Sequence, residues 1–128
     1  MDIESVRAYC LSFPHATENV QWGNDLVFKI AGKMFAVVVL EGASKYCLSF
    51  KCSEEEFAEL IEQDGIDPAP YSARYHWVAL ERNVLGEKEL KTLLRNSYDL
   101  VFAKLPKKLK TELNEKKDAS SKASRKRR

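Results

Sequence analysis

The stretch that decides the fold runs from residue 26 to residue 40 and reads Leu-Val-Phe-Lys-Ile-Ala-Gly-Lys-Met-Phe-Ala-Val-Val-Val-Leu. In its first half, Leu26, Phe28 and Ile30 occupy alternate positions, and a period of two is typical of a strand with one buried face. Gly32-Lys33 suits a tight hairpin turn, because glycine tolerates the positive φ that such turns require. The stretch therefore predicts a β-hairpin.

The second strand of this hairpin, residues 34–40, is apolar at every position, which indicates a central strand covered on both faces. A short loop at residues 41–44 leads to a third predicted strand at residues 45–52. Its alternation places one set of side chains, Tyr46, Leu48 and Phe50, opposite a second set, Lys45, Cys47, Ser49 and Lys51. Loops this short join only antiparallel neighbours, so the three strands should form a meander.

Before the hairpin, residues 2–13 predict a helix. Val6, Tyr9, Cys10 and Phe13 recur at helical spacing, with Asp2 as the cap and Pro14 as the stop. Residues 14–25, which contain Trp22-Gly23-Asn24, are interpreted as a loop.

After the meander, Ser53 and Glu56 form a capping box that begins a second helix, which should end at Gly65. Residues 66–74 contain two prolines and are interpreted as a loop. Residues 75–80 predict a fourth strand. From Glu87 a long apolar stripe predicts a helix that ends near Pro106.

The predicted order is α-β-β-β-α-β-α, an α+β fold with an antiparallel sheet of four to five strands flanked by helices. Residues 1–106 should form a single domain and residues 107–128 a disordered basic tail. The tail carries ten Lys/Arg and three Asp/Glu, a net charge of +7, whereas residues 1–106 carry eleven and sixteen, a net charge of −5. The two parts differ strongly in their electrostatic character.

Three features of the whole sequence indicate the cellular compartment of the protein. No apolar run approaches the roughly 20 residues needed to cross a bilayer, and residues 1–4 have neither a cationic start nor an apolar signal core. Cys10, Cys47 and Cys52 form an odd set without C-x-x-C spacing, which favours reduced thiols. We therefore expect a cytoplasmic protein without membrane insertion.

The sequence provides little for catalysis. Cys47 and Cys52 are five residues apart and would face opposite ways on one strand, and neither His15 nor His76 lies in a known catalytic motif. Cys47 and His76 could be neighbours on adjacent strands, but a buried thiol beside a histidine is explained more simply by side-chain packing than by catalysis. We expect no enzyme activity, no cofactor and no metal site.

Five short stretches together resemble a known family. They are Trp22-Gly23, residues 28–36, Leu48-Ser49-Phe50-Lys51, His76-Trp77-Val78, and Asn96 to Val101 with Lys104-Leu105. In this order they resemble the MmcQ/YjbR family of small bacterial proteins, over about residues 1–106. The resemblance implies the compact α+β fold of CyaY-like (frataxin-like) domains and DNA binding by a double-wing arrangement of hairpins. Iron binding through an acidic first helix is not carried over, because Asp2 and Glu4 are the only acids there.

The candidate nucleic-acid site combines cations with aromatic side chains. Its residues are Lys29, Lys33, Lys45 and Lys51 on or beside the strands, then Arg74, Trp22 and Trp77, and in the tail Arg125, Lys126, Arg127 and Arg128. These groups could contact the phosphates of DNA weakly and without sequence preference, while His76 is a further stacking candidate. The opposing interpretation is that the lysines protect the sheet from aggregation, the tryptophans belong to the core and the tail is merely solvated.

A second functional hypothesis uses the apolar surface instead of the charges. In it, residues 34–40 and the two tryptophans form a groove for a small ligand, a protein partner or a second copy of the chain. The net charge of residues 1–106 supports the opposing interpretation of the lysines, since an acidic body repels DNA at long range.

Overall fold

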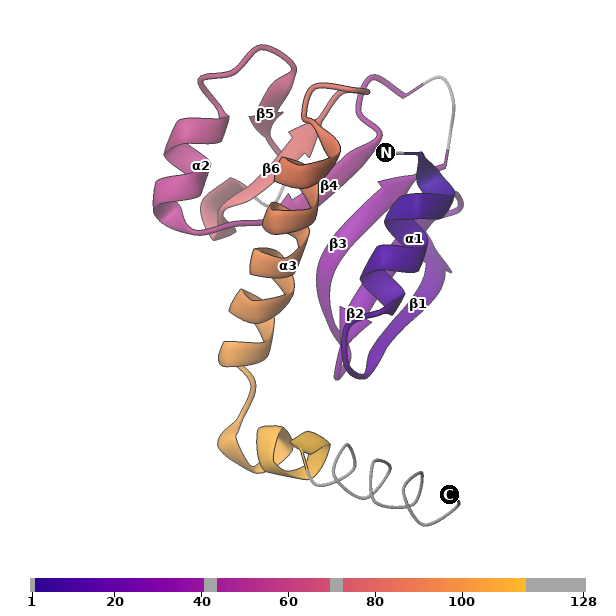
Figure 1. The fold of residues 1–128 in the computed structure, drawn as a ribbon, viewed down its shortest axis with the longest axis vertical. Helices are drawn as coiled ribbons and strands as arrows, with labels where there is room; N and C mark the ends of the chain where they lie inside the picture. The colour runs from indigo at the N-terminus through magenta and orange to yellow at the C-terminus, as the bar shows by residue number, and fades with distance from the viewer. Residues whose placement is uncertain (1, 41–43, 70–72, 115–128) are drawn as a thin grey trace.

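The computed structural model describes residues 2–40, 44–69 and 73–114 (Figure 1). Over these residues, six strands form one sheet in the order β1-β2-β3-β4-β6-β5, with every neighbouring pair antiparallel. The strands are β1 (Ala16–Gln21), β2 (Asp25–Ile30), β3 (Lys33–Val39), β4 (Leu48–Lys51), β5 (Ile66–Pro68) and β6 (Trp77–Leu80). The α+β class and the β2-β3-β4 meander predicted from the sequence are confirmed.

The central hairpin differs from the prediction only in the position of its turn. Ala31 and Gly32 occupy the turn with φ of 50° and 79°, and Lys33 already begins β3, where it pairs with Ile30. A two-residue turn with both φ values positive matches the right-handed twist of the flanking strands. Farther along, β3 skips Phe35 in its pairing with β2, which produces a bulge opposite Phe28 and Lys29.

Both strands that the sequence analysis missed lie at the edges of the sheet. The segment that forms β1 was interpreted as loop, because its residues, Ala-Thr-Glu-Asn-Val-Gln, are mostly polar and show no apolar period. An edge strand that is largely exposed needs no such period. The loop predicted at 66–74 contains β5, whose Pro68 is tolerated because an edge strand can leave one side of its backbone unpaired.

Two predicted strands are shorter than expected. β4 begins only at Leu48, and Tyr46 lies on the opposite face of the sheet from Leu48, contrary to the predicted alternation. β6 begins at Trp77 because η1 (Ala73–Tyr75) is a single turn of 3₁₀-helix.

The helices α1 (Ile3–Leu11) and α3 (Glu87–Ala103) pack against one face of the sheet, and α2 (Glu54–Leu60) packs beside β5 and β6 (Figure 1). We call this side the helix face; its core includes Phe28, Phe35 and Phe50 from the sheet. The opposite side, the outer face, has a smaller apolar cluster formed by Val27, Val37, Ala69, Trp77 and Ala79, with Met34 and Tyr46 beside it. β3 therefore has apolar neighbours on both faces, as its sequence predicts.

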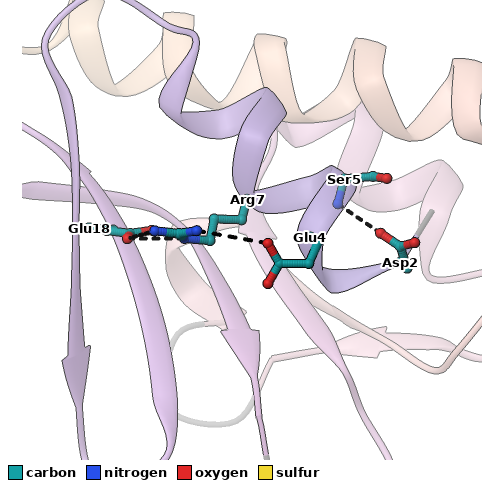
Figure 2. A network of polar contacts seen from close by, with 5 residues as sticks. All are labelled: Asp2, Glu4, Ser5, Arg7 and Glu18. Atoms are coloured by element: carbon teal, nitrogen blue, oxygen red, sulfur yellow. Dashed lines mark hydrogen bonds and ion pairs between the residues drawn. The ribbon is translucent and has the colours of Figure 1, made fainter.

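Polar contacts hold α1 in place (Figure 2). Asp2 caps the helix by accepting a hydrogen bond from the Ser5 backbone N–H at 2.7 Å, as expected from the sequence. Arg7 makes a bidentate contact with Glu18 of β1, with Nη2 to Oε1 at 2.7 Å and Nε to Oε2 at 2.8 Å. The guanidinium lowers the pKa of the Glu18 carboxyl by hydrogen bonding. This pair ties the first helix to the polar edge strand.

The predicted capping box of α2 is confirmed. Ser53 Oγ accepts from the Glu56 N–H at 3.1 Å, and Glu56 Oε1 accepts from the Ser53 N–H at 2.9 Å. Glu56 Oε2 also accepts from Asn96 on α3 at 3.0 Å, so the cap links the two helices. Replacing Ser53 with alanine should lower the free energy of unfolding by about 1 kcal/mol, measured by urea denaturation. An unchanged midpoint would mean that Glu56 alone maintains this helix end.

The predicted long helix is confirmed as α3, and its stripe Leu90, Leu94, Tyr98, Val101 and Leu105 is buried. Beyond Pro106, residues 107–114 are helical, and Leu109 and Leu113 pack against the helix-face core. The described start of the predicted tail is thus in contact with the domain. Tail residues 115–128 lie outside the described residues. Within the described ranges, no helix has both the length and the apolarity to cross a bilayer.

Candidate nucleic-acid interface

A cleft lined by three lysines lies at the end of the sheet where β3 begins and where β4 and α3 end, and we call it the lysine cleft. Lys33 reaches it from the start of β3, Lys51 from the end of β4 and Lys104 from the end of α3. Its other described lining residues, Met34, Tyr75, Trp77, Val101, Leu105 and Pro106, are uncharged, and its volume is about 640 Å³. Three elements distant in sequence therefore bring positive charge to one concave surface, and no acid is among the described residues that line it.

Lys51 is the most constrained of the three lysines. Its backbone N–H donates to Ser97 Oγ at 3.1 Å, and its Nζ donates to the Tyr75 carbonyl at 2.8 Å. Partial burial lowers the pKa of Lys51, and the positive charge of neighbouring Lys104 lowers it further. The ammonium groups of Lys51 and Lys104 repel each other. An anion bound in the cleft would reduce this electrostatic repulsion.

An apolar hollow adjoins the lysine cleft, and we call it the aromatic groove. Its lining includes Trp22, Val37, Tyr46, Trp77 and Ala79, and its volume is about 590 Å³. Met34 and Trp77 line both the groove and the cleft, so the two hollows are adjacent.

The two tryptophans have different roles. Trp77 is buried, with 8% of its surface exposed, and forms part of the apolar cluster of the outer face. Trp22 is 66% exposed and lies in the turn between β1 and β2 with a φ of 51°. The interpretation of the tryptophans as core residues therefore holds for Trp77 but not for Trp22.

The remaining predicted cations in the described part of the chain surround the two hollows. Lys29 pairs across the sheet with Met34 and lies on the same face as Val27. Lys45 Nζ lies 5.4 Å from the ring centroid of Tyr46, and the Arg74 guanidinium carbon lies 4.8 Å from that of Tyr75. Arg125, Lys126, Arg127 and Arg128 lie outside the described residues.

Acidic groups are sparse on this surface. Asp25 lines the aromatic groove, and Asp67 accepts a hydrogen bond from the Tyr46 hydroxyl at 2.5 Å. Many other acids are on the helices, including three in the first turn of α2. Of the described residues, the three that bring charge into the lining of the lysine cleft are all cationic.

His76 and the thiols lie apart from these hollows. The His76 ring packs 5.6 Å from Phe57 of α2, so the sequence-based suggestion of a stacking role on the cationic surface is not supported by its position. Cys47 lines a small cavity beside Ile3 and Val6 of α1 and is not paired with His76. Burial raises the pKa of Cys10 and Cys52 to about 12 and also raises that of Cys47, which keeps all three as weakly nucleophilic thiols at neutral pH. Across the described residues, no three His, Cys, Asp or Glu side chains are grouped as metal ligands.

Sequence analysis missed Lys104 and the positioning role of Ser97. Lys104 follows the last apolar turn of α3 and resembles any exposed helix-end lysine, so only the path of α3 across the sheet reveals its neighbours. In the sequence, the one sign of a special role for Ser97 is its small hydroxyl side chain within the apolar stripe of α3. In the structure Ser97 is fully buried. Such a side chain requires hydrogen-bond partners.

The fold defines a two-layer α+β protein with two adjacent hollows, the aromatic groove on the outer face and the lysine cleft at the end of the sheet where α3 ends. The chain belongs to the YjbR family, whose model matches residues 11–100. No curated protein matches the sequence.

Solved structures show the same architecture. The crystal structure of Deinococcus radiodurans protein DR2400, described as carrying a DUF419 domain, has 28% identity and a TM-score of 0.76, covering 88% of this chain and 87% of its own. A crystal structure of a Pseudomonas syringae protein has 23% identity and a TM-score of 0.65, covering 78% of this chain and 98% of its own. A solution structure from Pseudomonas syringae has 22% identity and a TM-score of 0.62, with 78% and 92% covered.

Proposed function

We propose that this chain is a non-enzymatic nucleic-acid-binding protein of the bacterial cytoplasm. It contacts phosphates through the cations around the lysine cleft, assisted by the basic residues of its C-terminal tail. The observation that carries this proposal is the meeting of Lys33, Lys51 and Lys104 in one concave surface whose described lining has no acid. Clustered lysines bind a phosphate backbone as point charges, so no base sequence is read by these contacts.

The surrounding cations extend this surface beyond a single phosphate. Lys29 lies beside Met34 on the same face, and Arg74 stands next to Tyr75 at the border of the cleft. No ion pair among the described residues involves any of these five cations. They are available to an external anion.

The test is fluorescence anisotropy of a labelled DNA duplex at about 50 and 200 mM salt, where each phosphate contact adds roughly one unit to the log–log slope. Four contacts would weaken binding roughly a hundredfold across this range. The double variant Lys33→Gln/Lys51→Gln should bind more weakly and reduce the slope by about two.

Lys88 and Lys91 provide a matched control, because both lie near the start of α3, whereas the lysine cleft is lined by residues at its end. The double variant Lys88→Gln/Lys91→Gln removes the same charge and should leave the slope nearly unchanged. Equal losses in the two double variants would indicate a general charge effect and contradict the assignment to the lysine cleft. A third variant, with glutamine at Arg125, Lys126, Arg127 and Arg128, measures the contribution of the tail.

The aromatic groove supports a second candidate function, a small-ligand or protein-interaction module. Its lining is mostly apolar, and its volume of about 590 Å³ lies within the range of small-molecule sites. Binding in the groove alone would change little with salt, whereas phosphate binding changes steeply. The salt series therefore separates the two functions.

A further inference from the structure

The lysine cleft and the aromatic groove are adjacent but chemically different. The lysine cleft presents ammonium groups, and the aromatic groove presents Trp22, Tyr46 and the Trp77 surface. Met34 and Trp77 line both hollows. A ligand that occupies the cleft and the groove together needs an anionic group for the lysines and a flat apolar group for the groove. A nucleotide unit with an unstacked base has this composition.

Trp22 is an unusual residue for its position. Bulky side chains rarely adopt a φ of 51°, and Trp22 gains little from burial because 66% of its surface is exposed. Strained, exposed conformations of this kind are concentrated at binding and active sites. The turn thus presents an indole ring at the groove in a backbone conformation that is costly for tryptophan.

We propose that the lysine cleft and the aromatic groove together bind single-stranded nucleic acid in preference to duplex, with a backbone phosphate in the lysine cleft and an unpaired base a few nucleotides further along the strand against Trp22, which lies at the opposite end of β2 and β3 from Lys33. In a duplex, the faces of the bases are covered by their stacked neighbours, so an aromatic groove can receive only an unpaired base. A cationic surface beside aromatic side chains is the combination that single strands require. This inference rests on the proposed function and specifies its substrate class.

Charge complementarity supports a phosphate in the cleft. The Lys51 ammonium is held by the Tyr75 carbonyl beside Lys104, and their repulsion contributes to the lowered pKa of Lys51. A phosphate would offset that repulsion. Among the described residues, Asp25, in the groove, and Asp67, hydrogen-bonded to Tyr46, are acids that a strand would approach, and both belong to the groove side.

The experiment compares a labelled single strand of roughly 12 nucleotides, within the site sizes of single-strand-binding proteins, with a duplex of the same sequence. The full chain is used at about 50 mM salt, with anisotropy and intrinsic tryptophan fluorescence as readouts. The single strand should bind about tenfold more tightly, as expected from stacking of one base, and should quench the tryptophan emission.

Trp22→Asn tests the groove without threatening the fold, because asparagine tolerates positive φ better than tryptophan does. This variant should lose the preference for the single strand, while its thermal midpoint stays unchanged or rises. Val20→Asn is the matched control: Val20 is 59% exposed on β1, but it pairs with Leu26 and so lies on the helix face. It should retain the preference. Lys104→Gln should weaken binding of both the duplex and the single strand, and it should reduce the salt slope by about one.

The outcomes distinguish this inference from the proposed function. Duplex binding equal to or tighter than single-strand binding overturns the inference and leaves the proposed function standing. Absence of binding to either nucleic acid overturns both. The inference is also overturned if the Trp22→Asn variant still prefers the single strand. It is likewise overturned if self-association of the protein buries Trp22 and the oligonucleotide does not quench the tryptophan emission.

Discussion

Replacing Tyr98 with alanine should lower the free energy of unfolding by about 3 kcal/mol, the range for removing a large buried aromatic side chain. Only 4% of Tyr98 is exposed, and its ring packs against Phe13, Phe35 and Phe102, with centroids 5.0, 5.5 and 6.1 Å away. The residue therefore joins α3 to the segment after α1 and to the bulge of β3. Urea denaturation followed by circular dichroism measures the loss.

Tyr98→Phe separates the hydroxyl from the ring. The Tyr98 hydroxyl donates to the Pro14 carbonyl at 2.6 Å. Losing this bond while keeping the ring should cost about 1 kcal/mol. A Phe variant as unstable as the Ala variant would show that the hydrogen bond, and not the packing, accounts for the role of Tyr98.

Replacing Ser97 with alanine should cost about 2 kcal/mol, because two backbone groups lose their side-chain partner in the interior. Ser97 Oγ donates to the Phe35 carbonyl at 2.6 Å and accepts from the Lys51 N–H at 3.1 Å. Phe35 is the residue that β2 leaves unpaired at the bulge, and Ser97 supplies its carbonyl with a donor. Ser97 thereby connects α3 to both β3 and β4.

Thr92 provides the control on the same helix. Its hydroxyl donates to the Lys88 carbonyl at 3.1 Å in an exposed position, so Thr92→Ala should change stability by less than about 0.5 kcal/mol. Equal effects at the two positions would contradict a special role for the buried hydroxyl. Because Ser97 also holds the Lys51 backbone, Ser97→Ala should weaken DNA binding as well, with Lys51 less rigidly positioned in the lysine cleft.

Local sequence signals correctly predicted the features that depend only on residues close together in the chain. The capping box at Ser53, the Asp2 cap and the apolar stripe of α3 each depend on residues within one or a few turns, and all three are present in the structure. The edge strands were missed for the opposite reason. β1 and β5 exist because a neighbouring strand supplies hydrogen-bond partners, and their own residues have no apolar period or include proline.

The sequence by itself determined the order of the main elements, the central hairpin, the YjbR-like character of the chain and the set of cations and tryptophans available to a ligand. Only the tertiary structure decided which of these side chains meet. Lys33, Lys51 and Lys104 come from the start of β3, the end of β4 and the end of α3, and Trp22 comes from a turn that sequence analysis assigned to a loop. Helix and strand periods depend on neighbouring residues, whereas a binding surface depends on pairing between segments distant in the chain, and no local pattern encodes that pairing.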